Sequence, residues 1–220
     1  MIFKDKDVIV FAGDSVTDMG STIPVGEGPK NDNLGRGYVR VAESMLDAFY
    51  PEIQLRIFNS GISGDTSRSL LARFDRDVTQ LNPDWVSICI GINDVWRQFD
   101  VPEKLETHIL PDEYEQNIEQ MIAKIKGKVK GIFILSPYIM EPCKEDAMRK
   151  RMDEYVEICR KLAQKHELVF VDMQKLYADY CTIRHSSYIA WDRIHPNMVG
   201  STLMARAFLD KCGFDYNHRA

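Results

Sequence analysis

A serine that directly follows a predicted buried strand is the first residue of this sequence with a capacity for chemistry. The apolar run from Val8 to Phe11 is typical of a buried strand, and the small residues Gly13-Asp14-Ser15 follow it. A serine at such a turn can serve as an exposed nucleophile, but Gly, Asp and Ser also dominate ordinary turns. Ser15 is therefore a candidate nucleophile only if the rest of the chain supplies a base.

The segment 191–196, Trp-Asp-Arg-Ile-His-Pro, can supply that base and its partner. One compact turn would let Asp192 accept from Nδ1 of His195 while Nε2 points at Ser15. Pro196 predicts a helix from about 196 to 211, with His195 near its amino end. The helix dipole disfavours the imidazolium and Asp192 favours it, so we expect the two effects to offset and leave a base that works near neutral pH. Taken alone, Asp192 could equally be a helix cap and His195 a residue bonded to backbone.

Acyl transfer also needs donors for the oxyanion, and two further turns can provide them. Gly64 lies in the small-residue turn 59–66, and Asn93 lies in Gly-Ile-Asn-Asp at 91–94. The candidate donors are the backbone N–H groups of Ser15 and Gly64 and the side-chain amide of Asn93. We expect glycine at 64 because the backbone must approach the substrate, and asparagine at 93 because a neutral donor does not titrate. Asn93-Asp94 is also compatible with a simple turn.

The predicted elements bring these turns together. Strands are expected at 8–11, 54–59, 85–90, 132–135 and 168–171, and the main helices at 38–49, 70–81, 111–125, 145–166 and 196–211. Loops are expected at about 15–34 and 95–110, the second carrying Trp96, Arg97 and Phe99. The alternation predicts one domain, 1–220, an α/β/α sandwich with a five-stranded parallel sheet in the flavodoxin-like order 2-1-3-4-5. The turns after the first three strands then share the carboxyl edge.

Composition and charge argue against several classes of protein and of binding partner. A net charge of -5 with scattered Lys and Arg gives no footprint for nucleic acid or an anionic membrane. The charged N-terminus and the lack of a long apolar run predict a soluble, cytoplasmic protein. Five cysteines without a C-x-x-C pair argue against structural disulfides and a zinc knuckle, and Cys89 is expected in the core.

Taken together, the four segments resemble the sequence blocks of the SGNH hydrolases, also called GDSL-like esterases. The matching segments, in order and across nearly the whole chain, are 13–15, 59–66, 91–94 and 192–196, although Val16 stands where the family name implies Leu. The resemblance implies a triad of Ser15, Asp192 and His195, an oxyanion hole from Ser15, Gly64 and Asn93, and ester hydrolysis without a cofactor or metal. The G-x-S-x-G elbow of the ordinary α/β-hydrolases is absent.

Within that family, four stretches resemble bacterial carbohydrate acetylesterases of the acetylxylan esterase type: 35–39, 83–88, 91–98 and 190–196. This resemblance implies a small acetylated carbohydrate and water as partners, removal of acetyl groups from xylose units, and a homo-oligomer. With a cytoplasmic location, xylo-oligosaccharides are expected rather than polymeric xylan. Trp191, Trp96 and Tyr188 are candidate substrate contacts, and packing is the alternative role for Trp96 and Tyr188.

Three other functions remain as alternatives at this point. A lysophospholipase or a thioesterase can use the same triad. A metallophosphoesterase also contains Gly-Asp and Gly-x-Asn-Asp signatures, but the first strand lacks a D-x-H ligand pair. A catalytically inactive carbohydrate-binding protein would not need the full set of chemical groups.

Overall fold

The computed structural model describes residues 1–29 and 32–219 and is built on one central sheet. The strand order is β2-β3-β1-β4-β5-β6. The strands are β1 (Val8–Gly13), β2 (Gly26–Glu27), β3 (Arg56–Gly61), β4 (Trp85–Cys89), β5 (Gly131–Leu135) and β6 (Val169–Val171). Apart from β2, neighbouring strands pair in parallel. The predicted order of the five parallel strands is therefore confirmed.

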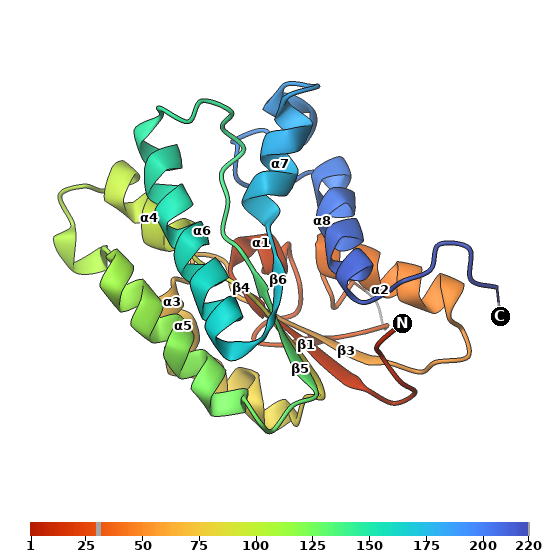
Figure 1. Cartoon of the computed structure of the whole chain (residues 1–220). Helices are drawn as coiled ribbons and strands as arrows, with labels where there is room; N and C mark the ends of the chain where they lie inside the picture. The colour runs from red at the N-terminus through yellow and green to blue at the C-terminus, as the bar shows by residue number, and fades with distance from the viewer. Residues whose placement is uncertain (30–31, 220) are drawn as a thin grey trace.

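Helices cover both faces of the sheet (Figure 1). One group comprises α3 (Ser67–Asp77), α4 (Ile92–Asp100), α5 (Pro111–Ile125) and α6 (Ala147–His166), and the other comprises α2 (Tyr38–Phe49), α7 (Met173–Cys181) and α8 (Met198–Lys211). A four-residue helix, α1 (Ser15–Asp18), and the short 3-10 turns η1 (Thr79–Leu81), η2 (Leu105–Thr107) and η3 (Ser186–Tyr188) complete the set. The buried apolar residues form two clusters, one beneath each group of helices. The three-layer architecture follows from burying both faces of a parallel sheet.

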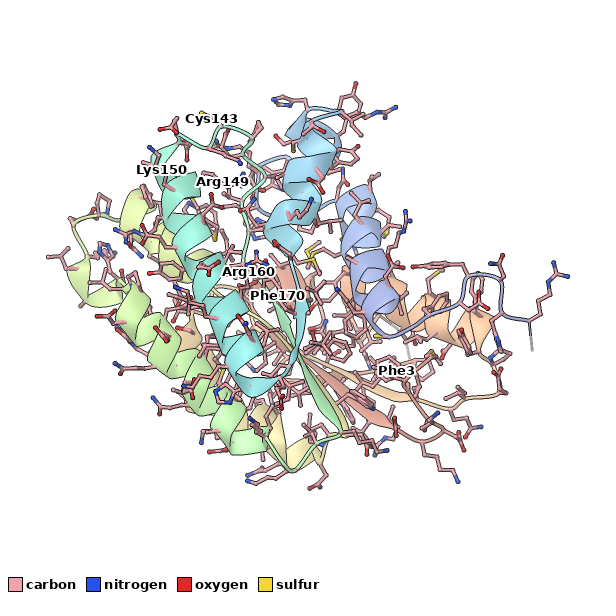
Figure 2. All side chains as sticks on the ribbon, viewed as in Figure 1. Phe3, Cys143, Arg149, Lys150, Arg160 and Phe170 are labelled. Atoms are coloured by element: carbon pink, nitrogen blue, oxygen red, sulfur yellow. The ribbon has the colours of Figure 1, made fainter. Side chains whose placement is uncertain are left out.

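Packing on the two faces joins distant parts of the chain. The ring of Phe3 stacks with that of Phe208 of α8, with centroids 6.3 Å apart, and its centroid lies 6.4 Å from that of the Phe133 ring of β5. On the other side, the Arg160 guanidinium of α6 lies 4.8 Å from the centre of the Phe170 ring of β6 (Figure 2). Within the described ranges, no helix has the length and apolar character needed to cross a membrane.

The strand register determines where the functional turns emerge. Gly13 at the end of β1 pairs with Gly61 at the end of β3 and with Cys89 at the end of β4. The turns that carry Ser15, Gly64 and Asn93 begin from one row of the sheet. Cys89 itself is buried, as expected of a core residue.

Three expectations from the sequence are wrong in detail. The sheet has a sixth strand, β2, which pairs antiparallel with β3 at the edge and is too short to give a periodic sequence signal. The segment expected as a loop with Trp96, Arg97 and Phe99 begins as helix α4. The last helix begins at Met198 with Asn197 as its N-cap, so Pro196 lies before the helix rather than in its first turn.

Candidate active site

Ser15 is held at the carboxyl edge by a capped turn. The side-chain Oδ1 of Asp14 accepts the backbone N–H of Val16 at 2.9 Å and caps helix α1, which makes Ser15 the first residue of that helix. A Cβ at Gly61 would lie 2.2 Å from the backbone nitrogen of Asp18, so glycine at 61 lets α1 pack directly on the end of β3. The position of Ser15 is therefore fixed by β1, which it follows, and by β3, on which α1 packs.

The structure brings Ser15, His195 and Asp192 into one hydrogen-bonded chain. Ser15 Oγ lies 2.8 Å from Nε2 of His195, and Nδ1 of His195 lies 2.5 Å from Oδ2 of Asp192. When the carboxylate holds the proton at Nδ1, the lone pair at Nε2 faces the serine hydroxyl. This arrangement can remove the hydroxyl proton as the oxygen attacks.

Asp192 is fixed by the turn that it closes. Its Oδ1 accepts the backbone N–H groups of Ile194 at 2.9 Å and His195 at 2.8 Å. Burial by itself would raise the pKa of Asp192, but hydrogen bonds from the His195 side chain and these two N–H groups together lower it below its usual value. Asp192 is therefore a carboxylate at neutral pH and can hold His195 in one orientation.

Asn93 is buried in the first turn of α4 with its amide held at both ends. Its Nδ2 donates to the backbone carbonyl of Asp65 at 2.9 Å, and its Oδ1 accepts from the Arg97 guanidinium at 3.3 Å. Because an amide nitrogen carries two hydrogens, one N–H of Asn93 is left for a substrate oxygen.

Gly64 lies in a tight turn that requires its backbone conformation. The Asp65 N–H donates to the Ile62 carbonyl at 3.1 Å, and Gly64 has a φ of 87°. A Cβ at this position would meet no protein atom within 4 Å. The positive φ, rather than crowding by the protein, therefore explains why glycine stands at 64. Among the described residues, no group accepts the Gly64 N–H, so it is available to a substrate oxygen.

Comparisons with known proteins agree with this geometry. Residues 11–203 match the GDSL-like Lipase/Acylhydrolase family. This chain belongs to that family. It is 43% identical to an acetylxylan esterase from Geobacillus stearothermophilus over 94% of each chain.

Two solved structures extend the similarity of this GDSL-like chain to its fold. A catalytic mutant (S15A) of Axe2, an acetylxylan esterase from Geobacillus stearothermophilus, is 41% identical over the whole of both chains, with a TM-score of 0.96. LAE5, an alpha/beta hydrolase enzyme from the metagenome of Lake Arreo, Spain, is 45% identical over 97% of this chain and 98% of its own, with a TM-score of 0.93.

Two of the three predicted aromatic contacts lie beside the triad of this GDSL-like protein. The rings of Trp96 and Trp191 lie 6.2 and 6.5 Å from the His195 ring, the first edge-on and the second stacked. Trp96 is half-buried, whereas Trp191 is 85% exposed. Tyr188 in η3 is also exposed, and its ring lies 5.4 Å from the Arg184 guanidinium. The structure brings Trp96 and Trp191 to the imidazole, and Tyr188 lies on a neighbouring loop.

Arg97 contacts the site but was not singled out from the sequence. Its guanidinium donates to Asn93, lies 4.7 Å from the Trp96 ring centre, and forms an ion pair with Asp100. The signal that could have revealed it is the spacing of four residues between Asn93 and Arg97, which places both on one face of a helix. The sequence pattern favours a loop over this segment, and a loop gives the spacing no such meaning.

Two buried acidic side chains, those of Asp14 and Asp94, support the site from beneath. Burial raises the pKa of Asp14 to about 8 and that of Asp94 to about 7. Asp94 accepts both the backbone N–H and the hydroxyl of Ser67, the first residue of α3, at 3.0 and 2.5 Å. This contact ties the start of α3 to the turn that contains Asn93. In the part of the chain that the structure describes, no three His, Cys, Asp or Glu side chains are grouped as a metal site would require.

Proposed function

We propose that this protein is a serine esterase that removes acetyl groups from acetylated carbohydrate, with xylo-oligosaccharides as its substrates. The observation that carries the proposal is the hydrogen-bonded chain from Asp192 through His195 to Ser15. A serine hydroxyl is a weak nucleophile unless a base takes its proton, and this geometry supplies both the base and the group that orients it.

The reaction follows from the positions of these groups. His195 accepts the proton of Ser15 as Oγ attacks the acetyl carbonyl, and the developing oxyanion accepts hydrogen bonds from the N–H groups of Ser15 and Gly64 and from Asn93. The protonated His195 then donates its proton to the sugar oxygen, which leaves as the alcohol. A water molecule, deprotonated by His195, attacks the acetyl-Ser15 ester. His195 then returns this proton to Ser15 Oγ as the ester bond breaks and acetate leaves.

Similarity to the acetylxylan esterase and the surroundings of Trp191 support the substrate class. A cavity of about 310 Å³ beside Trp191 is lined mostly by polar groups, including those of Glu141, His185, Ser187 and Arg193. Hydroxyl-rich sugars suit a polar wall with one exposed indole, whereas a long acyl chain needs an apolar channel. These features favour an acetylated sugar over the substrate of a lysophospholipase or a thioesterase.

A substrate panel tests the proposal. Acetate release from acetylated xylo-oligosaccharides and 4-nitrophenyl acetate is measured for the wild type and for Ser15→Ala, whose fold is checked by circular dichroism. We expect turnover of both substrates by the wild type and none by the folded variant. Full activity of Ser15→Ala would overturn the nucleophile assignment. A strong preference for 4-nitrophenyl esters with acyl chains of eight carbons or more would favour the lysophospholipase or thioesterase. Binding of oligosaccharide without any hydrolysis would point to a carbohydrate-binding protein.

We also infer that the protein is cytoplasmic and that it forms a homo-oligomer, the second as its resemblance to the acetylxylan esterase type implies. Light scattering coupled to size-exclusion chromatography tests the assembly, and cell fractionation tests the location. A monomer at micromolar concentration would contradict the first inference, and recovery outside the cytoplasm would contradict the second.

A further inference from the structure

Arg73 is a buried cation beneath the site that the triad does not use. It lies on α3, its side chain is 8% exposed, and it reaches the carboxyl ends of β1 and β3. A buried charge is costly unless it is paired and fully hydrogen-bonded, so its surroundings indicate what it holds in place.

Every N–H of the Arg73 guanidinium has a hydrogen-bond acceptor. Nε donates to Asp65 Oδ2 at 2.6 Å. One terminal nitrogen donates to Ser60 Oγ at 2.9 Å and to Asp77 Oδ2 at 3.3 Å. The other donates to the backbone carbonyls of Gly13 at 3.1 Å and Ser60 at 2.9 Å. A guanidinium has five N–H donors in a rigid plane, and these contacts use all of them.

Two of these acceptors lie close in the sequence to the proposed oxyanion donors. Gly13 precedes Ser15 by two residues, and Asp65 directly follows Gly64. The backbone carbonyl of Asp65 is also the acceptor for Asn93 Nδ2, at 2.9 Å. Arg73 therefore joins the segments that carry Ser15 and Gly64 directly, and the segment that carries Asn93 is joined to them through the Asp65 carbonyl.

We propose that Arg73 is the positioning residue of the oxyanion hole: it holds the amides of Ser15, Gly64 and Asn93 in the relative positions that acyl transfer requires. This inference rests on the proposed esterase function. Lysine cannot replace it, because an ammonium group has three donors on one nitrogen and cannot span acceptors on two strands and a turn.

The first test compares Arg73→Lys with the wild type on 4-nitrophenyl acetate. Misplacing donors by about 1 Å costs about a hundredfold, and losing one donor costs about 10²- to 10³-fold in kcat. We expect Arg73→Lys to lower kcat about 30- to 300-fold and to change KM less than about threefold, because the donors act mainly in the transition state. A kcat within threefold of the wild type would overturn the proposal.

A double-mutant cycle separates positioning from general damage to the fold. If Arg73 acts through the oxyanion hole, Arg73→Lys and Asn93→Ala affect the same interaction. The fold-loss of kcat in the double variant should then be at least tenfold smaller than the product of the two single fold-losses. Losses that multiply would overturn the proposal. Leu162→Ala is the matched control for instability, because Leu162 is buried on α6 in the core beneath α3 to α6, and its kcat per folded enzyme should match the wild type.

The fraction of folded enzyme is measured by end-point labelling of Ser15 with a fluorophosphonate, and kcat is calculated per labelled enzyme. If Arg73→Lys does not fold, Asp65→Asn takes its place, because it weakens the shortest Arg73 contact and leaves the Asp65 carbonyl intact. The same sub-multiplicative loss with Asn93→Ala is expected, and a multiplicative loss or unchanged kcat would overturn the proposal. The wild type and Ser15→Ala, assayed alongside, report on the esterase function itself, so its failure is recognised separately.

Discussion

Replacing Asp192 by asparagine separates the chemical role of this carboxylate from its structural role. Asparagine retains an oxygen for the backbone N–H groups of Ile194 and His195, but it turns an N–H₂ group toward Nδ1 of His195. The imidazole must then present its lone pair to the amide at Nδ1 and carry its proton on Nε2. That proton points at Ser15, so His195 can no longer accept the serine proton.

The loss can be estimated from that inversion. Forcing the wrong tautomer costs about 10³- to 10⁴-fold in kcat, which is about 4–5.5 kcal/mol at about 1.36 kcal/mol per decade. Stability should change little, because the turn keeps its two backbone hydrogen bonds. Asp192→Ala loses both bonds, each contributing about 1 kcal/mol, and should be less stable by about 2 kcal/mol.

The assay is kcat for 4-nitrophenyl acetate between pH 6 and 9, with urea unfolding of both variants. A kcat of Asp192→Asn within about tenfold of the wild type would refute the reasoning, because the tautomer would then not limit the reaction. Equal stability of Asp192→Asn and Asp192→Ala would refute the assignment of the two backbone bonds.

Three further predictions address the oxyanion hole, the aromatic wall and a buried carboxylate. Asn93→Ala should lower kcat for 4-nitrophenyl acetate about 10²- to 10³-fold with KM nearly unchanged, and a comparable change in KM would contradict its role in the transition state. Trp191→Ala should raise KM for acetylated xylo-oligosaccharides about three- to tenfold and spare 4-nitrophenyl acetate and the melting temperature, because the side chain is 85% exposed. Asp14 has a pKa raised from 3.8 to about 8 by burial, so the folded state binds the proton more tightly and loses stability as pH rises between these values. The slope is up to about 1.4 kcal/mol per pH unit. Asp14→Asn keeps the helix cap but does not titrate. Its free energy of unfolding in urea, relative to that of the wild type, should therefore increase from pH 5 to 8, and a pH-independent difference would count against this.

The fold was predictable where the signal was long and periodic. The five parallel strands and α2, for example, lie close to their predicted positions, because alternating strands and amphipathic helices leave few topologies. The two-residue β2 was not predictable, because its pairing with β3 depends on contacts rather than on a local pattern. Helix α4 was not predictable because Gly91 and a run of site residues resemble a turn, while packing against α6 stabilises a helix there.

The site also has a predictable part and an unpredictable part: the residues that react, and the residues that hold them in place. Asp192 and His195 are three residues apart, so their pairing could be inferred from spacing, and the strand order brought Ser15 to them. The positive φ of Gly64 could not be predicted, because a turn conformation cannot be distinguished from close substrate approach in a sequence.

Arg73 could not be recognised from the sequence, because its importance lies in acceptors on Gly13, Ser60 and Asp65 that only the folded chain brings within reach of one guanidinium. These acceptors are backbone carbonyls, a serine hydroxyl and a carboxylate in a turn, none of which has a sequence signature of its own. A nucleophile, base and orienting acid reveal themselves by residue type. An oxyanion hole is made largely of backbone, and its precision depends on whatever side chain ties the turns together. The residues that set the rate of such an enzyme therefore include ones that contact neither the substrate nor the triad.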